Sequence, residues 1–378
     1  MTGALDGLLV VSLEQAVAAP FCTQRLADSG ARVIKVERTG GETARHYDAT
    51  VQGHSAYFVW LNRGKESAVL DLKAPQDMAL FLAMLERADV LVQNLIPGAL
   101  ARMGLDAATV AARFPRLIVA NIAGYGQDTA YADMRAYDML VQAESGIAGV
   151  TGTAAEACKI GVSAADISTG LTAYAAVLEA LIARGITGRG GQVDVAMFDV
   201  MADWMAVPLL HLEQADRPTV RHGLEHAVIY PYGPMVCADG TLVVAVQNNA
   251  EWVRFCKVVL LRPDLAADGR FAINADRAAL RLTLDAEIAP VVAALTTVEL
   301  IARLGAGRIA WGRLSAVADL AAHPALRRMQ VPLADGSRVT MPRPPGRSAG
   351  FVSGAVPGIG AATERLRAEF LGVEFLGA

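Results

Sequence analysis

The sequence has few cysteines, no zinc-protease histidine motif and no long uninterrupted hydrophobic run. Its 378 residues include four cysteines, none in a CxxC pair, and six histidines, none in an HExxH motif. We therefore expect neither a disulfide framework nor a bound metal ion. Even the apolar segment 167–184 carries serine, threonine, glycine and glutamate, so we expect no membrane span. The N-terminus has no basic, signal-like region, which predicts a cytoplasmic protein.

Several motifs of nucleotide-binding proteins and hydrolases are also missing. There is no GxGxxG after the first predicted strand and no GxxxxGK[ST], and no GxSxG lies between a predicted strand and a helix. We therefore expect no nicotinamide or flavin cofactor and no activated serine. With 34 basic and 38 acidic residues, the net charge of −4 does not fit a nucleic-acid binder. A hydrophobic share of 53% is typical of a well-buried globular protein.

The first forty residues predict a strand, a helix and a second strand. Gly7–Leu13 and Ala31–Val36 are short apolar runs, as in parallel strands buried on both faces, and Pro20 lies near the start of the helix between them. Further buried strands are expected over Val90–Gln93 and Leu117–Ile122. This alternation predicts an α/β, Rossmann-like doubly wound domain, with ligands beyond the carboxyl ends of the strands.

Composition changes along the chain predict a smaller domain inserted into the larger one. Tyr230–Val236 and Thr241–Val246 flank an Asp239–Gly240 turn and predict a β-hairpin, followed by helical patterns. We expect a large domain over 1–205, a linker over 206–228, a small α+β domain over 229–325, a second linker over 326–346 and a return to the large domain over 347–378.

Several ordered blocks of sequence stand out along the chain. They are AAPFCTQRLADSGARVIKVER near the N-terminus, GHSAYFVWLNRGKESAVLDLK (53–73), VLVQNLIPGALARMGLD (90–106), YDMLVQAESGIAGVTG (137–152), GVSAADISTG (161–170), GRGGQVDVAMFD (188–199) and the C-terminal GIGAATERLRAEFLG. In this order they resemble the family III CoA-transferases over nearly the whole chain, with the central domain the least similar. The resemblance implies an enzyme that moves coenzyme A between a small carboxylic acid and an acyl-CoA. It also implies a homodimer of two interlocked rings.

Asp166 is the candidate catalytic residue. It is expected just before a helix over 168–184, where an aspartate alone would be interpreted as an N-cap. The resemblance instead implies the nucleophile of the family, because the family's aspartate stands at this place in the motif. Such a carboxylate displaces CoA to form a mixed anhydride, and the thiolate then attacks it to give an aspartyl-CoA thioester. Small neighbouring residues leave room for the bulky thioester.

The resemblance also implies residues that bind coenzyme A and protect the intermediate. Those that hold the nucleotide and pantetheine are Arg38, Asn94, Arg102 and Met103, with Leu72 and Lys73 near the adenine and phosphates. From the residues alone, each arginine could equally be an ordinary surface side chain. Where formyl-CoA transferase has Lys, Glu and Gln, this chain has Arg135, Asp138 and Val17, and nearby Gln15 is a candidate to replace the glutamine.

A second group of residues is a candidate site for the distal carboxylate of a dicarboxylic acid. It comprises Arg45, His46 and His54, with Arg63 nearby; the alternative is a solvated polar loop. The segment around His54 resembles members that handle succinyl-CoA and C4–C5 dicarboxylates such as mesaconate, itaconate or citramalate. The glycine-rich flap of formyl-CoA transferase is missing, which argues against formyl and oxalyl substrates. His222 and His226, in the first linker, are further candidates.

Three alternatives remain open from the sequence. The α-methylacyl-CoA racemases belong to another branch of the fold that the resemblance implies, and they use a histidine where this chain has Tyr137. The missing histidine favours CoA transfer over racemisation. Tyr137 is then a candidate substrate contact. A non-catalytic CoA-binding protein would keep the arginines and tolerate loss of Asp166. A Rossmann dehydrogenase would need the missing glycine fingerprint.

Overall fold

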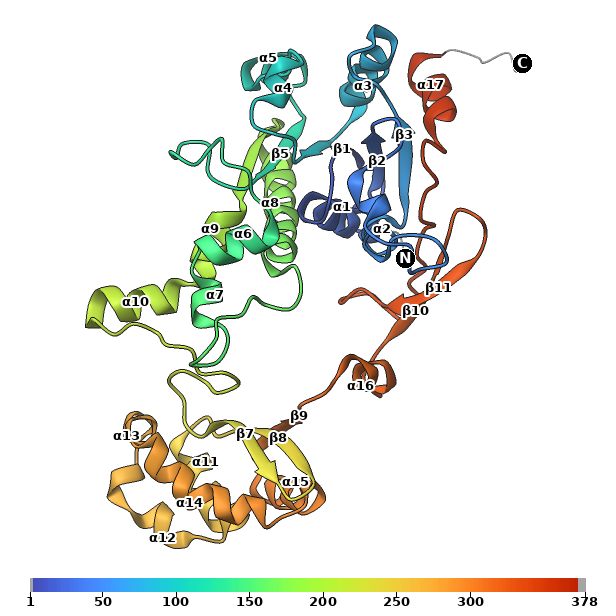
Figure 1. Cartoon of the computed structure of the whole chain (residues 1–378). Helices are drawn as coiled ribbons and strands as arrows, with labels where there is room; N and C mark the ends of the chain where they lie inside the picture. Colours follow the sequence, from blue (N-terminus) through green and yellow to red (C-terminus); the bar gives the residue numbers. More distant parts are fainter. Residues whose placement is uncertain (1–2, 373–378) are drawn as a thin grey trace. The chain divides into compact units, whose positions relative to one another are not determined.

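The computed structural model describes residues 3–372, and its contacts divide the chain into two units (Figure 1). Unit 1 contains the N-terminal part up to Ile147, Ile160–Val207 and the chain from Arg327 onward. Unit 2 contains Ala148–Lys159 and Pro208–Leu326. The short helix α7 (Ile147–Val150) lies at one boundary between them.

Unit 1 is built on a six-stranded parallel sheet with the order β3-β2-β1-β4-β5-β6. This is a doubly wound order whose direction reverses between β1 and β4, where ligands of such folds bind. All five residues of β1 are buried, as expected for a strand covered on both faces. The predicted α/β fold is confirmed. The strands are β1 (Leu9–Leu13), β2 (Arg32–Glu37), β3 (Lys65–Val69), β4 (Val90–Gln93), β5 (Ile118–Ala123) and β6 (Gly191–Ala196).

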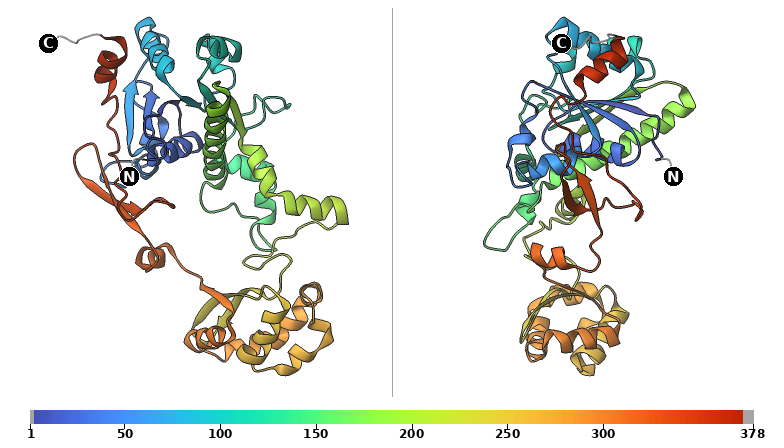
Figure 2. Two further views of the ribbon diagram at one scale, coloured as in Figure 1. Left: turned by 180° about the vertical axis from the view of Figure 1, so that it is seen from behind. Right: turned by 90° about the vertical axis from the view of Figure 1, so that its right-hand side faces the viewer.

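Helices cover both faces of this sheet (Figures 1 and 2). Residues of α3, α5 and α17 form a core with one face, while α1 and α8 pack together on the other. The helices of unit 1 are α1 (Ala18–Asp28), η1 (Thr43–His46), α2 (Ala56–Asn62), α3 (Pro75–Arg87), α4 (Ala99–Arg102), α5 (Ala107–Arg113), α6 (Asp138–Glu144), α8 (Ala164–Thr187), α9 (Met197–Trp204) and α17 (Thr363–Leu371). By length and composition alone, α8 could span a membrane, as core helices often can.

Three segments differ from the sequence-based expectation. Strand β3 was not predicted, because its charged residues Lys65 and Glu66 interrupt the apolar pattern. The expected linker over 326–346 contains a hairpin of β10 (Arg328–Pro332) and β11 (Arg338–Pro342), because alternate residues of β10 are buried in a small core. The expected linker over 206–228 begins with helix α10 (Ala206–Ala215).

Unit 2 has its own core between a three-stranded antiparallel sheet and a set of helices. The strands are β7 (Tyr232–Cys237), β8 (Gly240–Ala245) and β9 (Ala310–Arg313), so the predicted β7–β8 hairpin is confirmed. The helices after β8 are α11 (Asn249–Arg254), the π-helix η2 (Phe255–Leu260), α12 (Pro263–Ala267), η3 (Gly269–Phe271), α13 (Asn274–Ala279), α14 (Arg281–Ala293), α15 (Thr297–Gly307) and α16 (Val317–Ala322).

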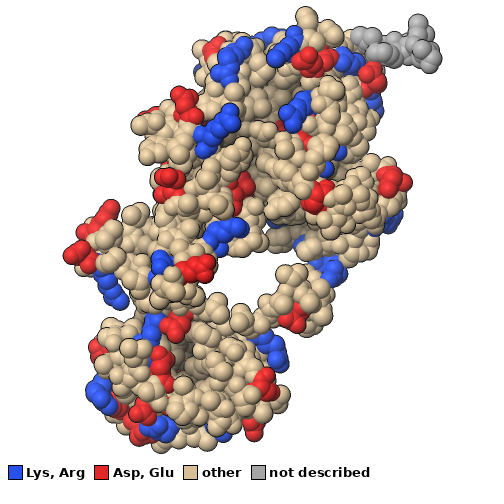
Figure 3. All heavy atoms as spheres, viewed as in Figure 1, with Lys and Arg blue, Asp and Glu red and all other residues tan. Residues whose placement is uncertain are grey.

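Basic and acidic side chains are interspersed on the face of the molecule drawn in Figure 3. This distribution agrees with the nearly balanced count of 34 basic and 38 acidic residues. On the face drawn in Figure 3, no large patch of one sign of charge marks a binding site among the described residues.

Candidate active site

Asp166 lies in the first turn of α8, which begins at Ala164. The sequence analysis started this helix at Ser168 and placed Asp166 before it, and that prediction was wrong. Ala164 and Ala165 are strong helix formers and extend the helix toward the N-terminus. Ser163 occupies the N-cap position and makes no side-chain cap hydrogen bond. Asp166 is therefore an acidic residue in the first turn, where the unpaired amides of a helix favour negative charge.

Asp138, the first residue of α6, caps α8 from a different segment of the chain. Its Oδ1 accepts hydrogen bonds from the backbone N–H groups of Ala165 (2.9 Å) and Asp166 (3.3 Å). Its Oδ2 accepts one from Gln142 Nε2 at 2.8 Å. Asp138 was predicted to contact coenzyme A. In the structure its carboxylate fixes the start of the helix that carries Asp166.

The Asp166 carboxyl has an unusual protonation equilibrium for an aspartate. Burial, and then the negative charge of Asp138, raise its pKa to about 7, while a hydrogen bond from the Ala18 backbone N–H acts in the opposite direction. A carboxylate held in such a site loses much of the hydration that normally makes carboxylates poor nucleophiles. Asp166 can therefore act as a nucleophile when it is ionised.

Ala18 is the first residue of α1, and its close approach to α8 depends on Gly170. A side-chain carbon at Gly170 would lie 2.4 Å from Ala18 O and 2.9 Å from Phe21 Cβ. Gly170 is one turn after Asp166 on the same helix, so a glycine there lets the start of α1 reach the carboxylate. The start of α1 thus supplies the Ala18 N–H to the Asp166 carboxyl, while the first N–H groups of α8 are held by Asp138.

The turn between β1 and α1 is held by Asn94, which follows β4. Asn94 Oδ1 accepts from the Gln15 backbone N–H, and Asn94 Nδ2 donates to the Gln15 carbonyl, both at 2.9 Å. Gln15 itself is exposed, while Val17 is only 3% exposed and packs in a small cluster with Phe21 and Leu61. Asn94 thus holds the backbone beside Asp166, and the Val17 side chain belongs to the core.

Of two tyrosines near Asp166, one was identified from the sequence and the other was missed. Tyr137 was proposed as a substrate contact and is 66% exposed, at the N-cap of α6. Tyr47 was missed. Burial and the negative charges of Glu42 and Asp166 raise the pKa of its hydroxyl. Its only sequence signal is a position directly after the candidate group Arg45–His46.

The remaining residues proposed for coenzyme A have mainly local partners. Arg38 is exposed and donates to Gly41 O at 3.1 Å, and Arg102 is exposed and donates to Pro97 O at 3.2 Å. Lys73 and Arg135 are also exposed. Leu72 and Met103 are partly buried against the core of unit 1. None of these six residues lines the cavity at the carboxyl ends of the central strands.

A cavity of about 590 Å³ lies in unit 1 near the carboxyl ends of β4, β5 and β6. Its lining includes residues 95–101, beside Asn94 and Arg102. The charged residues that line it are acidic: Asp106, Asp128, Asp194 and Asp199. Four carboxylates disfavour phosphate groups, so we do not assign the CoA phosphates to this cavity.

The predicted dicarboxylate group is not one cluster in the structure. Arg45 forms a two-point ion pair with Glu37, at 2.6 and 2.7 Å, and Arg63 is buried against Asp28 at 2.5 Å. His46 Nε2 lies 3.1 Å from Gly40 O. His54 lies near Asp335, whose pKa it helps to lower after hydrogen bonds from Ser337. Each side chain has its own partner.

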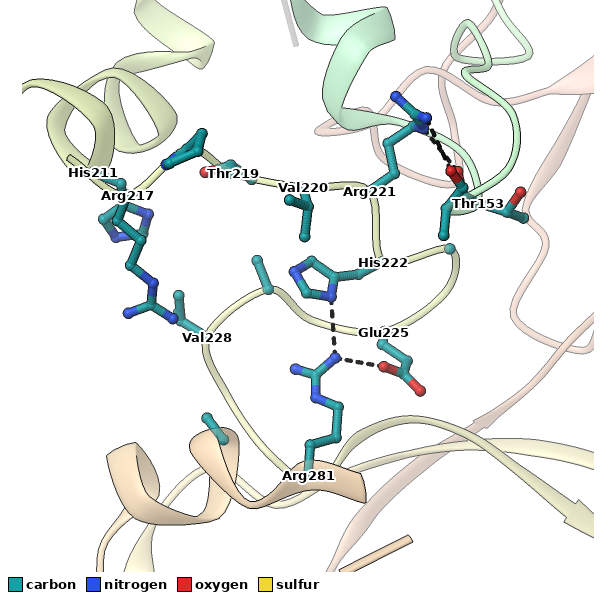
Figure 4. Close-up of a pocket in the computed structure, with 15 residues that line it drawn as sticks. Thr153, His211, Arg217, Thr219, Val220, Arg221, His222, Glu225, Val228 and Arg281 are labelled. Carbon is teal, nitrogen blue, oxygen red and sulfur yellow. Dashed lines mark hydrogen bonds and ion pairs between the residues drawn. The ribbon is translucent and has the colours of Figure 1, made fainter. Parts of the chain in front are cut away.

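Unit 2 contains a second cavity of about 590 Å³, lined in part by Arg217, Arg221, His222, Glu225 and Arg281 (Figure 4). Arg281 Nη1 lies 2.5 Å from Glu225 Oε2 and 3.1 Å from His222 Nδ1. Burial and the Arg281 charge lower the pKa of His222. Among residues 3–372, no group of three His, Cys, Asp or Glu side chains is arranged to hold a metal ion.

Comparison with known proteins points to one family. The family model described as CoA-transferase family III matches residues 5–363. The acetyl-CoA:oxalate CoA-transferase of Acetobacter aceti is 38% identical over 73% of this chain and 72% of its own. The succinyl-CoA:mesaconate CoA-transferase of Haloarcula hispanica is 33% identical over 92% of this chain and 93% of its own. A crystal structure of a CAIB/BAIF family protein from Brucella suis superimposes with a TM-score of 0.81, at 32% identity over 98% of this chain and 100% of that chain.

Proposed function

Because the chain belongs to CoA-transferase family III, we propose that Asp166 carries the transferred groups of a CoA-transfer reaction as covalent intermediates. The observation that carries this proposal is the position of Asp166: half-buried in the first turn of α8, with a pKa raised to about 7 and a backbone N–H of Ala18 directed at it. A side chain used only as a helix cap would gain nothing from this burial.

The proposed reaction begins with attack of a carboxylate oxygen of Asp166 on the thioester carbonyl of the donor acyl-CoA. The C–S bond breaks, CoA leaves as a thiolate, and the donor acyl group remains on Asp166 as a mixed anhydride. The thiolate then attacks the Asp166 carbonyl, which releases the donor acid as a carboxylate and forms an aspartyl-CoA thioester. The acceptor carboxylate repeats the two steps in reverse. The backbone N–H of Ala18 at the start of α1 is suited to stabilise an oxyanion that forms at the Asp166 carboxyl.

For the substrates, we propose succinyl-CoA or another C4–C5 dicarboxylate CoA, with an acceptor of the mesaconate, itaconate or citramalate type. The name of the Haloarcula enzyme supports a succinyl donor and an unsaturated C5 acceptor. The name of the Acetobacter enzyme adds oxalate, which the sequence analysis argued against, and acetyl-CoA to the compounds worth screening. A screen in which only monocarboxylates accept CoA would contradict the dicarboxylate proposal.

We further propose that the protein acts as a homodimer in the cytoplasm. Large apolar side chains are exposed along α8 (Leu171, Ile182, Ile186) and along α10 (Leu209, Leu210, Leu212). Exposed apolar surface of this extent marks association surfaces in soluble proteins. Light scattering coupled to size exclusion tests the proposal, since a 39.7 kDa particle at micromolar concentration would contradict it.

The experiment that tests the nucleophile is a search for the covalent adduct. The protein is incubated with succinyl-CoA and digested, and the Asp166 peptide is analysed by mass spectrometry for a mass increase of CoA. We expect the adduct in the wild-type protein and in Asp276→Asn, which also removes a first-turn aspartate but from α13 of unit 2. We expect none in Asp166→Asn. Unimpaired CoA exchange in Asp166→Asn would end the proposal.

The same preparation separates transfer from racemisation and from simple binding. A racemase would exchange the α-proton of a methyl-branched acyl-CoA in deuterated water without forming an adduct. A binding protein would retain acyl-CoA without either reaction. We expect CoA exchange without α-proton exchange, because Tyr137 stands where the racemase histidine would be.

The pH dependence of adduct formation follows from the Asp166 pKa. Only the ionised carboxylate attacks, so the rate of the first half-reaction should rise with pH up to about 7 and level off above it. A rate that falls between pH 6 and 8 would show that another group limits the reaction. Rapid-quench measurement of the adduct gives this profile directly.

A further inference from the structure

Four charged side chains form a chain of ion pairs inside unit 1, beneath the β1–α1 turn. Glu14 Oε1 lies 2.8 Å from Lys65 Nζ and 3.2 Å from Lys35 Nζ. Lys35 Nζ in turn lies 2.6 Å from Glu42 Oε1. The exposed fractions of the four side chains are 0% for Glu14, Lys35 and Lys65 and 4% for Glu42. Two lysines and two glutamates balance each other, as buried charges must.

At one end of this series of ion pairs, Glu42 contacts the backbone beside the candidate active site. Glu42 Oε2 accepts a hydrogen bond from the Ala16 backbone N–H at 2.8 Å. Ala16 has a φ of +63°, in the left-handed region that alanine rarely adopts. Such a conformation is unfavourable for an alanine by about 1–2 kcal/mol and persists only where neighbouring groups fix it. The Glu42 carboxylate is such a group.

The orientation of Ala16 decides where the start of α1 points. Val17 is the N-cap of α1 and Ala18 is its first residue. Ala18 packs against α8 at Gly170, one turn after Asp166, and its backbone N–H favours the ionised form of the Asp166 carboxyl. On the other side of the turn, Asn94 holds Gln15 by two hydrogen bonds of 2.9 Å. The turn is thus fixed at Gln15 by a neutral amide and at Ala16 by a buried carboxylate.

We infer that Glu42 is a positioning residue for CoA transfer: by holding Ala16 in its left-handed turn, it aims the Ala18 N–H at the reacting carboxyl of Asp166. Glu42 contacts neither the Asp166 side chain nor a substrate in this account. Its charge is needed because a buried carboxylate is the partner of Lys35, and a hydrogen bond from N–H to a carboxylate is stronger than one to a neutral oxygen. This inference rests on the proposed function of Asp166.

The test compares the variants Glu42→Gln and Glu42→Ala with the matched control Glu66→Gln. Glu66 lies on β3, and the control breaks its ion pairs with Arg32 and Arg365. Glutamine can still accept the Ala16 N–H, whereas alanine cannot. We expect kcat to fall about 10-fold in Glu42→Gln and about 100-fold in Glu42→Ala, with KM for the acyl-CoA changed less than about 3-fold. The control should retain wild-type kcat.

A second pair of measurements keeps the test decisive if Glu42→Ala does not fold. In Glu42→Gln, Lys35 and Lys65 share the single carboxylate of Glu14. The double variant Lys35→Met/Glu42→Gln removes this excess positive charge and keeps an acceptor for the Ala16 N–H. We expect it to recover stability relative to Glu42→Gln while kcat stays reduced. Recovery of wild-type kcat in the double variant would show a purely structural role and overturn the inference. A fall in kcat accompanied by a rise in KM of similar size would do the same.

The covalent adduct separates this inference from the function that it assumes. If the wild-type protein forms the Asp166 adduct and Glu42→Ala forms it equally fast, the positioning role is refuted and the nucleophile stands. If the wild-type protein forms no adduct with any donor, the proposed function itself fails. Slow adduct formation in Glu42→Ala, with an unchanged final yield, is the expected result.

Discussion

Two charge networks in the molecule differ mainly in their exposure to water. The network of unit 1 joins Glu14, Lys35, Lys65 and Glu42 with at most 4% of any side chain exposed. In unit 2, Arg281 pairs with Glu225, whose side chains are 14% and 37% exposed. In the first network each charge depends on its partners, whereas in the second network water can replace a lost partner. Burial, more than the number of ion pairs, determines how strongly charges fix a backbone.

The largest expected effect comes from removing the central carboxylate of the buried network. Glu14→Gln removes the carboxylate 2.8 Å from Lys65 and the ion pair of 3.2 Å between Glu14 and Lys35. We therefore expect a loss of about 3–5 kcal/mol in the free energy of unfolding. Urea denaturation measures it. A loss below about 1 kcal/mol would show that this network behaves like a surface ion pair.

The acid sensitivity of the same network has a defined direction. Glu14 has its pKa lowered to about 2, against burial, by Lys35 and Lys65. Its folded pKa is below the unfolded value of 4.5, so its contribution to stability is present above about 4.5 and is lost as the pH falls toward 2. The wild-type protein should therefore lose stability in this window, and Glu14→Gln should lose less.

The next effect concerns the close approach of α1 and α8. Gly170→Ala places a carbon 2.4 Å from Ala18 O, so the helices must separate. We expect a loss of about 1–3 kcal/mol in stability and a fall in kcat of about 10-fold or more. Gly185→Ala, on the same helix with open space around it, is the control. Equal activity of the two variants would refute the role of this contact.

Asp166→Asn should raise stability at neutral pH while it removes activity. The folded pKa of about 7 lies above the unfolded value of 3.8, so the wild-type protein loses stability as the pH rises from about 4 through 7. Asparagine carries no charge and avoids this loss. We expect the Tm of the variant to exceed that of the wild type by a few degrees at pH 8 and by less at pH 5. A lower Tm at pH 8 would contradict the buried charge.

The smallest effect is expected in unit 2. Glu225→Gln leaves Arg281 with the His226 carbonyl at 2.8 Å and with water, so we expect a change of about 0–1 kcal/mol that shrinks further in high salt. Urea denaturation in low and high salt measures it. A loss comparable to that of Glu14→Gln would remove the contrast between the two networks.

Strands β1, β2, β4 and β5 could be predicted from the sequence because each contains a short run that is mainly apolar. Val90–Gln93 was located residue for residue, since both faces of a central parallel strand are buried. Strand β3 was missed because Lys65 points into the buried network, which makes a core strand look polar. Of the two charges that obscured β3, Lys65 belongs to the buried network that reaches the β1–α1 turn, whereas Glu66 pairs with Arg32 and Arg365.

The candidate site was only partly predictable. Asp166 was found through the resemblance, but its protonation equilibrium depends on Asp138, which lies 28 positions earlier in the chain. The role of Ala18 could not be predicted, because every residue except proline has a backbone N–H and the residue type does not show which one is used. Arg45 looked available for a substrate carboxylate, yet Glu37, eight positions away, occupies it. Asp138 and Ala18 are set by contacts between distant elements, whereas Arg45 is set by a nearby partner that the sequence pattern does not identify.

The pairing of Ala18 with Asp166 also constrains how the molecule folds. The two residues are 148 positions apart, and the strands β2 to β5 lie between them in the sequence. Closing so large a loop is entropically unfavourable and, like other non-local contacts, slow. During synthesis Ala18 cannot contact Asp166 until α8 has emerged, so the geometry of the candidate site forms only after the chain from β2 to β5 has been made.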